Sequence, residues 1–336
     1  MDSITHVVLG AVIGEALAGK KLGKKAMLFG AIAQSLPDID FVASFWLSFS
    51  ANLIAHRGIT HSFFFVIIAS VPIALALSRW YTKAEMSFKS WYIFWVVQMS
   101  VHLLIDACNA YGTGWFEPFS SLRVAFHFLF VADPFYTVWL LIATVALFVL
   151  RRDHPARIKW VVASLALSSL YIIYAYSNRY AIEEDVNNSL KRNNIIYQRV
   201  LITPTPLNTW LWFVAVEADD GFYISHRATA DHNREVPNYF FPQNAQVLDT
   251  LRDRETLNHL LRFSEGYYIV EERDDKLIFS DLRFGQITGW ATPKEKFVFH
   301  YYLNHPEDNL LVIQRGRFAN WNKETVGEMI RRIRGK

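Results

Sequence analysis

Long apolar segments fill the first 180 residues of the chain, and short alternating segments follow them. The stretches 5–19 and 26–36 are each shorter than the roughly 20 residues of a full membrane span, so we expect a helical hairpin packed among longer helices. Residues 41–55, which follow Pro37 and an acidic pair, are typical of an interfacial or re-entrant segment. Spans are predicted at 62–78, 90–107, 128–150 and 160–177.

Beyond residue 180 the pattern changes to that of a water-soluble α+β domain. Strand-like runs at 210–216 and 222–227 flank the turn Ala218-Asp219-Asp220-Gly221. The repeated Thr-Pro pairs at 203–206 are interpreted as a kinked linker. Further predicted elements are an amphipathic helix at 246–263, strands at 267–270 and 277–279, and a basic helix at 323–334.

The charges are distributed as a membrane half and a soluble half require. Residues 1–180 hold 14 Lys and Arg but nine Asp and Glu, whereas residues 181–336 hold 20 and 22. The net charge of +3 therefore comes from the first half, where it indicates membrane topology, so no nucleic-acid partner is expected. We predict an α-helical multipass membrane domain at 1–180, followed by a small soluble α+β domain at 181–336.

Three basic turns, at 20–25, 79–89 and 151–159, predict the orientation in the cytoplasmic (inner) membrane. Because cytoplasmic loops are rich in Lys and Arg, alternate crossings from these turns place residues 181–336 on the extracytoplasmic side. Six of the nine carboxylates of the membrane half and five of its histidines are predicted on that same side, which favours one site: Asp2, His6, Asp38, Asp40, His56, His61, His102, Asp106, Glu117, His127 and Asp133.

The predicted site begins with the segment His56-Arg57-Gly58-Ile59-Thr60-His61-Ser62. His102 and Asp106, four residues apart on a helix, project from one face, and Asp2 and His6 repeat that spacing. Either pair alone is more typical of a carboxylate–imidazole hydrogen bond that holds a helix end. Taken together, the predicted metal ligands are His6, Asp38, Asp40, His56, His61, His102 and Asp106. Because Cys108 is the only cysteine, a thiolate cage is excluded, and a divalent metal is expected, with zinc favoured over manganese or iron.

Six ordered motifs resemble the YdjM-like family of membrane-bound predicted metal-dependent hydrolases. They are Asp2–His6, Leu36–Asp40, His56–Ser62, His102–Asp106 with Asn109–Thr113, Pro118–Ser120, and Asp133–Phe135. The resemblance implies a multipass membrane protein with hydrolase activity. The order of His and Asp residues is also distantly similar to the zinc-dependent phospholipase C and single-strand nuclease superfamily. That superfamily's later ligands have only loose counterparts in His127 and Asp133, so its full three-metal cluster is not expected.

The predicted function is hydrolysis of a phosphoester in a lipid-linked or phosphorylated small molecule, with membrane lipids as neighbours. His102 and Asp106 are assigned to catalysis with Arg57, because a guanidinium binds phosphate oxygens in pairs. Arg57 is equally typical of a structural partner for Asp38 or Asp40. The alternatives are a transporter or ion pathway, and a non-catalytic membrane scaffold with structural metal; ligands at helix ends and in loops favour the enzyme.

Overall fold

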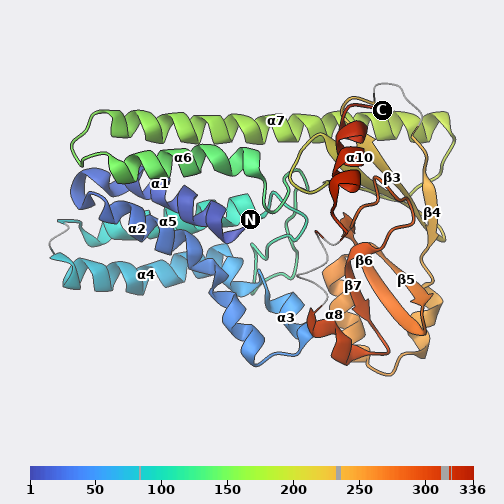
Figure 1. Ribbon diagram of the computed structural model, residues 1–336. Helices are drawn as coiled ribbons and strands as arrows, with labels where there is room; N and C mark the ends of the chain where they lie inside the picture. Colours follow the sequence, from blue (N-terminus) through green and yellow to red (C-terminus); the bar gives the residue numbers. More distant parts are fainter. Residues whose placement is uncertain (83–84, 232–235, 312–317, 319) are drawn as a thin grey trace. The chain divides into compact units, whose positions relative to one another are not determined.

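The computed structural model describes residues 1–336 except 83–84, 232–235, 312–317 and 319 (Figure 1). Lys83 of the second basic turn therefore lies outside the described residues. The chain divides into two compact units. The first contains Met1–Phe45, Ala55–Phe126 and Val131–Tyr174, and the second contains Trp46–Ile54, His127–Phe130 and Ala175–Lys336.

The first unit begins with a tightly packed hairpin of helices α1 (Ser3–Leu22) and α2 (Lys25–Ser35). A Cβ atom added to Gly30 would lie 2.0 Å from the carbonyl oxygen of Gly10, so only small residues let the two backbones approach this closely. The predicted hairpin is present, but α1 is longer than expected. It has 20 residues, or about 30 Å, because Asp2 caps its start by accepting the Thr5 N–H and the helix continues through Lys21.

The expected interfacial segment is divided in two. The 3₁₀ helix η1 (Pro37–Phe45) is bent by 52° from α2, as in a broken span or a re-entrant loop. Helix α3 (Phe49–Ala55) follows it and belongs largely to the second unit. A short 3₁₀ turn, η2 (Ile59–His61), then leads into α4 (Phe63–Trp80), whose start is capped by Ser62.

Two helices in the described part of the chain are long and apolar enough to cross a membrane, α4 and α7 (Ala156–Arg192), or three spans if α2 and η1 count as one. Helix α5 (Phe88–Asp106) lies against α4 in the same unit (Figure 1). Helix α6 (Pro134–Val149) starts later than predicted because Asp133 caps it by accepting the N–H groups of Phe135 and Tyr136. Helix α7 runs well past its predicted end at 177.

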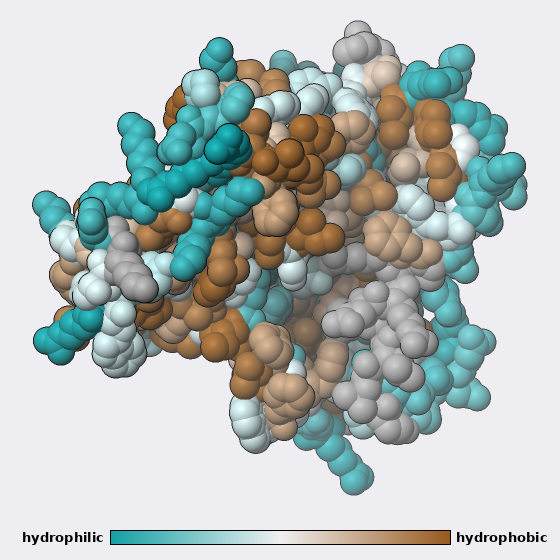
Figure 2. Space-filling view, turned by 60° about the vertical axis from the view of Figure 1, so that its left-hand side comes forward, coloured by the Kyte–Doolittle hydropathy of each residue, from teal (hydrophilic) through white to brown (hydrophobic). Residues whose placement is uncertain are grey.

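The core of the first unit lies along the inner face of α5. Trp91, Phe94 and Met99 are buried there against side chains of α2 and α4. By contrast, large apolar side chains on α4, α6 and α7 are exposed, among them Phe148 and Val149. Brown apolar surface is accordingly extensive in Figure 2, as expected for helices that face lipid.

The second unit contains two antiparallel sheets. The four-stranded sheet has the order β1 (Val200–Pro204), β2 (Leu211–Ala218), β3 (Gly221–Ala228), β4 (Tyr239–Pro242), and the three-stranded sheet has β5 (Tyr268–Arg273), β6 (Lys276–Gln286), β7 (Phe297–Tyr302). Phe213, Phe222, Ile269 and Leu282 form a shared core. The remaining elements are the 3₁₀ helices η4 (Ala245–Thr250) and η5 (Pro306–Leu311) and the helices α8 (Arg254–Ser264) and α10 (Lys323–Ile333).

Two predictions in this half were wrong in detail. Residues 203–204 are not part of a linker, because Thr203 pairs with Phe213 as part of β1, and Pro204 ends that edge strand, where its missing N–H costs no hydrogen bond. The single helix expected at 246–263 is split into η4 and α8, because Asp253 starts a new helix by accepting the Thr256 N–H. Strands β4 and β7 were not predicted.

Candidate metal centre

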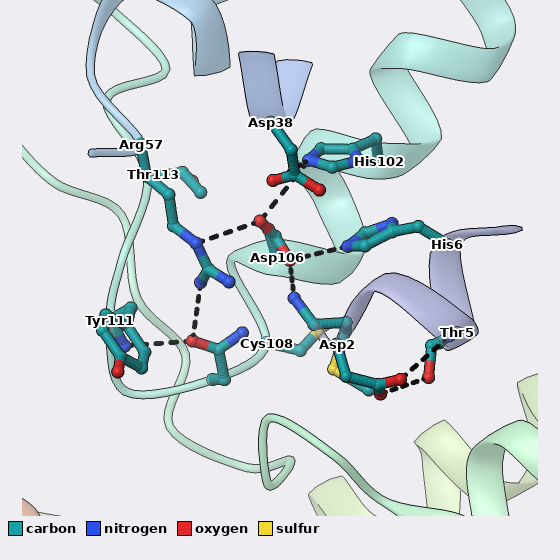
Figure 3. Close-up of polar contacts among 12 residues, drawn as sticks. Asp2, Thr5, His6, Asp38, Arg57, His102, Asp106, Cys108, Tyr111 and Thr113 are labelled. Carbon is teal, nitrogen blue, oxygen red and sulfur yellow. Dashed lines mark hydrogen bonds and ion pairs between the residues drawn. The ribbon is translucent and has the colours of Figure 1, made fainter. Parts of the chain in front are cut away.

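Four potential metal ligands come together where α5 ends. Asp38 comes from η1, His61 from η2, and His102 and Asp106 from successive turns at the end of α5. Figure 3 shows Asp38, His102 and Asp106 with their side chains directed toward one another. One ligand atom from each of the four residues lies within 4.8 Å of the other three.

Five of the six distances between these four ligand atoms are short and similar, as expected for the edges of a tetrahedron around one ion. His61 Nε2 lies 3.1 Å from His102 Nε2, 3.4 Å from Asp106 Oδ2 and 3.5 Å from Asp38 Oδ1. His102 Nε2 lies 3.6 Å from Asp38 Oδ1 and 3.5 Å from Asp106 Oδ2. The centre of a tetrahedron with such edges is about 1.9–2.2 Å from each corner, which matches the roughly 2.0–2.2 Å of zinc–nitrogen and zinc–oxygen bonds. The residues therefore fit a single four-coordinate ion.

Hydrogen bonds on the far side of each imidazole direct its Nε2 atom inward. His102 Nδ1 lies 2.5 Å from the carbonyl oxygen of Gln34, to which only a protonated Nδ1 can donate. His61 Nδ1 lies 3.1 Å from Thr60 Oγ1 and 3.5 Å from Asp40 Oδ2. Burial lowers the pKa of His61 well below its ordinary value, which favours the neutral imidazole that binds metals. A carboxylate behind a ligating histidine is a common way to fix its tautomer and orientation.

The cluster is closed on most sides and open at one ligand. The side chains of His61, His102 and Asp106 are 0% exposed, whereas that of Asp38 is 31% exposed. A purely structural site is usually enclosed by all four ligands, and a catalytic site keeps an accessible position. The exposure of Asp38 gives water or a substrate a direction of approach.

Arg57 contacts Asp40 through its backbone and the metal cluster through its side chain. Its backbone is in the left-handed region, with φ of 57°, and its N–H donates to Asp40 Oδ2 at 2.6 Å. Its guanidinium turns to the metal cluster instead, with Nε 3.2 Å from Asp106 Oδ2 and Nη1 donating to Asn109 Oδ1 at 3.0 Å (Figure 3). It also lies over the ring of Tyr111, 5.0 Å from the ring centroid. The guanidinium is thus held beside a ligand by three contacts.

His6 lies beside the cluster, on the other oxygen of Asp106. Its Nε2 is 3.1 Å from Asp106 Oδ1, which the Met1 amine also contacts, and its Nδ1 is 3.4 Å from Gln34 Oε1. The ring of His6 stacks on His102 with 3.8 Å between centroids. These contacts position Asp106 and His102.

The predicted ligands Asp40 and His56, like His6, are not among the four residues whose ligand atoms converge. Asp40 Oδ2 is 3.2 Å from His56 Nδ1, and the His56 side chain is 40% exposed. Arg123 donates to the carbonyl oxygen of His56. Asp133 belongs to a different contact, because its Oδ2 accepts the Tyr171 hydroxyl at 2.9 Å and its other oxygen caps α6.

Two supporting residues were missed by sequence reasoning. Gln34 contacts His6 through its side chain and His102 through its carbonyl oxygen, and it is fully buried. The signal for it was a polar residue within the apolar stretch 26–36. Asn109 had been noted only as part of a motif, and its contact with Arg57 depends on how the chain turns after α5.

The family model of the YdjM inner membrane protein matches residues 1–182, which contain every residue of this cluster. The chain belongs to the YdjM inner membrane protein family. YfhP of Bacillus subtilis (strain 168) is 26% identical to it over 341 residues, which cover 88% of this chain and 97% of YfhP. The inner membrane protein YbcI of Escherichia coli (strain K12) is 29% identical over 122 residues, or 36% of this chain and 69% of YbcI. No solved structure matches. This YdjM-family chain is thus a membrane protein with a cluster able to hold a metal ion.

Proposed function

We propose that the protein is a membrane-embedded metal-dependent hydrolase that acts on a phosphoester of a lipid or lipid-linked molecule. The observation that carries the proposal is the tetrahedral set of Asp38, His61, His102 and Asp106, in which only Asp38 is accessible. Zinc is the favoured ion, because the distances fit tetrahedral coordination and manganese prefers six oxygen-rich ligands.

The chain's own residues supply the rest of the chemistry. A divalent ion held by Asp38, His61, His102 and Asp106 would lower the pKa of a bound water to about 7 and polarise a phosphoryl oxygen. Asp38 lies on the accessible side, so a substrate approaches from there. Arg57, held by Asn109 and Tyr111, presents a fixed guanidinium next to Asp106, where it stabilises negative charge that develops on a phosphoryl group. His6 and Asp40 orient the ligands.

The proposed arrangement in the inner membrane is multipass, with the metal cluster and the sheet-containing region on the extracytoplasmic side. It is supported by the basic turns at 20–25, 79–89 and 151–159, which are expected in the cytoplasm. A site at the end of α5 then lies at headgroup depth, where the phosphoester of a lipid is found.

The hydrolase is tested with the purified full-length protein, its metal content and a panel of phosphomonoesters and phosphodiesters. Wild type is expected to contain about one divalent ion per chain and to hydrolyse at least one class. Arg57→Lys should retain the ion but turn over about a hundredfold more slowly, because lysine keeps the charge without the paired planar donors. Metal without any turnover would favour the scaffold, and wild-type turnover in Arg57→Lys would remove Arg57 from catalysis.

The orientation is tested by cysteine labelling in intact cells. In a Cys108→Ser background, single cysteines at Lys89 and Asp275 are treated with an impermeant thiol reagent. Labelling of position 275 alone is expected. Labelling of position 89 alone would reverse the topology and move the site to the cytoplasm.

A further inference from the structure

Two of the basic turns that are far apart in the sequence line one pocket in the first unit. Lys20 and Lys21 come from the end of α1, and Arg152 and His154 come from the loop before α7. The pocket has a volume of about 740 Å³. Hydrophilic side chains gather at this end of the unit beside apolar surface (Figure 2). Topology alone requires basic loops, but it does not require them to converge on a cavity.

One cation of the pocket lining, Arg157, is bound by other groups of the protein. Arg157 donates from Nε and Nη2 to the two oxygens of Glu15, both at 2.7 Å, and from Nη1 to the carbonyl oxygens of Leu147 and Leu150. Its side chain is 5% exposed. The opposite charges of Glu15 and Arg157 therefore cancel, and the pair is a structural part of the pocket wall.

The other basic groups keep donors available. Arg152 Nη2 donates to the carbonyl oxygens of Lys20 at 2.6 Å and Lys21 at 3.1 Å, and these bonds hold the loop against α1. No residue in the described ranges accepts a hydrogen bond from Nε or Nη1 of Arg152. Lys20 is exposed, and its ammonium has no polar partner among the described residues. His154 accepts the Ala156 N–H at Nδ1, so its proton is on Nε2. With Asp153 the sole unpaired acid in the lining, the pocket is positive.

Apolar side chains line the same pocket on the side toward the middle of the helices. Leu17 lies one turn before Lys20 on α1 and is 45% exposed, and Ile158 lies in the first turn of α7 and is 60% exposed. A ligand that fits this lining has an anionic group next to an apolar chain. His6 and Lys21 are fifteen residues apart on α1, or about 22 Å, so the pocket is at the opposite end of the helix from the metal cluster.

We propose that this pocket binds the headgroup of an anionic phospholipid. The phosphate contacts Lys20, Arg152 and His154, and an acyl chain follows Leu17 and Ile158. Basic pockets between membrane helices on the cytoplasmic side are suited to such headgroups, and each cation near the surface contributes about tenfold or less to binding. The site is separate from the proposed hydrolase centre and does not depend on its activity.

The test is native mass spectrometry of the full-length protein titrated with phosphatidylglycerol or phosphatidylcholine. Phosphatidylglycerol is expected to bind at least about tenfold more tightly than phosphatidylcholine, and Lys20→Gln with Arg152→Gln should remove that difference. The matched control, Arg79→Gln with Lys89→Gln, removes two cations from another basic turn and should leave it unchanged. Glycerol phosphate in excess distinguishes a phosphate site from a lipid site, because only the former is emptied by the soluble compound.

The single variant Lys20→Gln protects the test against misfolding, since it breaks no contact within the described structure. It should weaken phosphatidylglycerol binding severalfold while size-exclusion behaviour and metal content stay those of wild type. Equal binding of both lipids, an equal loss in the control variant, or displacement by glycerol phosphate would each overturn the proposal. None of these readouts involves hydrolysis, so the outcome is independent of the proposed function.

Discussion

Each unit contains a buried cluster of ionisable residues, the metal cluster in the first and the Asp281–Arg283 pair in the second, and the two differ in how their atoms are paired. In the second unit Asp281 and Arg283 are both 0% exposed and satisfy each other. Arg283 donates to Asp281 from its backbone N–H at 2.9 Å, from Nε at 3.1 Å and from Nη2 at 2.8 Å, and its Nη1 donates to Glu265 at 2.9 Å. Every charge there faces an opposite charge.

The cluster of the first unit brings like atoms together. The Nε2 atoms of His61 and His102 lie 3.1 Å apart, and carboxylate oxygens of Asp38 and Asp106 complete the group. Imidazole nitrogens and carboxylate oxygens that converge on one point are the ligands that zinc and similar divalent ions take. Burial of charge does not by itself indicate a functional site, because the residues of both clusters are buried. The pairing of donors with acceptors distinguishes a structural cluster from a ligand set.

The largest effect is expected when one carboxylate charge is removed from the metal cluster. Asp106→Asn should weaken zinc binding by more than about a hundredfold, because it removes a ligand and the anion that faces His6 and Arg57. Zinc affinity, measured by competition with a chelator, checks this. An affinity equal to that of wild type would exclude Asp106 from the ligand set.

The matched change in the second unit, Asp281→Asn, should lower stability and leave zinc affinity unchanged. Asp281→Asn leaves the buried Arg283 short of its counter-charge, and loss of one partner of such a pair costs about 3–5 kcal/mol of stability. Thermal unfolding should therefore occur at a lower temperature while zinc affinity is retained. A loss of zinc at temperatures where Asp281→Asn remains folded would contradict the division of roles.

A variant with a smaller expected effect tests whether Asp40 is a metal ligand or a supporting residue. Asp40→Asn keeps an oxygen for the Arg57 N–H but weakens the contact behind His61. Supporting residues of this kind typically change metal affinity by about 10–100-fold. An effect as large as that of Asp106→Asn would make Asp40 a direct ligand, and no effect would make it a partner of His56 alone.

The smallest expected effect concerns pH and the second unit. Burial, with Arg332 nearby, lowers the pKa of His226 from 6.5 to about 3. The unfolded chain therefore binds a proton below pH 6.5 that the folded chain excludes, and stability decreases by about 1.4 kcal/mol per pH unit as the pH falls from 6.5 toward 3. Unfolding temperatures measured between pH 7 and 5 should decline less in His226→Gln than in wild type. Identical declines would show that other groups cause the acid sensitivity.

Local features of the structure could be predicted from the amino-acid sequence. The apolar pattern located the helices of the first unit, and the four-residue spacing of His102 and Asp106 placed both on one face of α5. The turn at Asp219-Asp220 and its flanking strands followed from alternation and turn residues. These features depend only on residues a few positions apart in the chain. The periodicity of side chains along a helix or strand, together with backbone preferences, is sufficient to predict them.

Which of the seven candidate ligands meet depends on how the helices pack, and it could not be predicted from local sequence. The close contact of Gly10 with Gly30 fixes α1 against α2, and α2 in turn places the Gln34 carbonyl behind His102. The left-handed backbone of Arg57 turns its guanidinium to Asp106 and its N–H to Asp40. Ligand sets, the joining of two basic turns into one pocket, and the entry of Pro204 into a sheet all depend on contacts between distant residues. Such contacts are set by packing of whole elements, which no local pattern encodes.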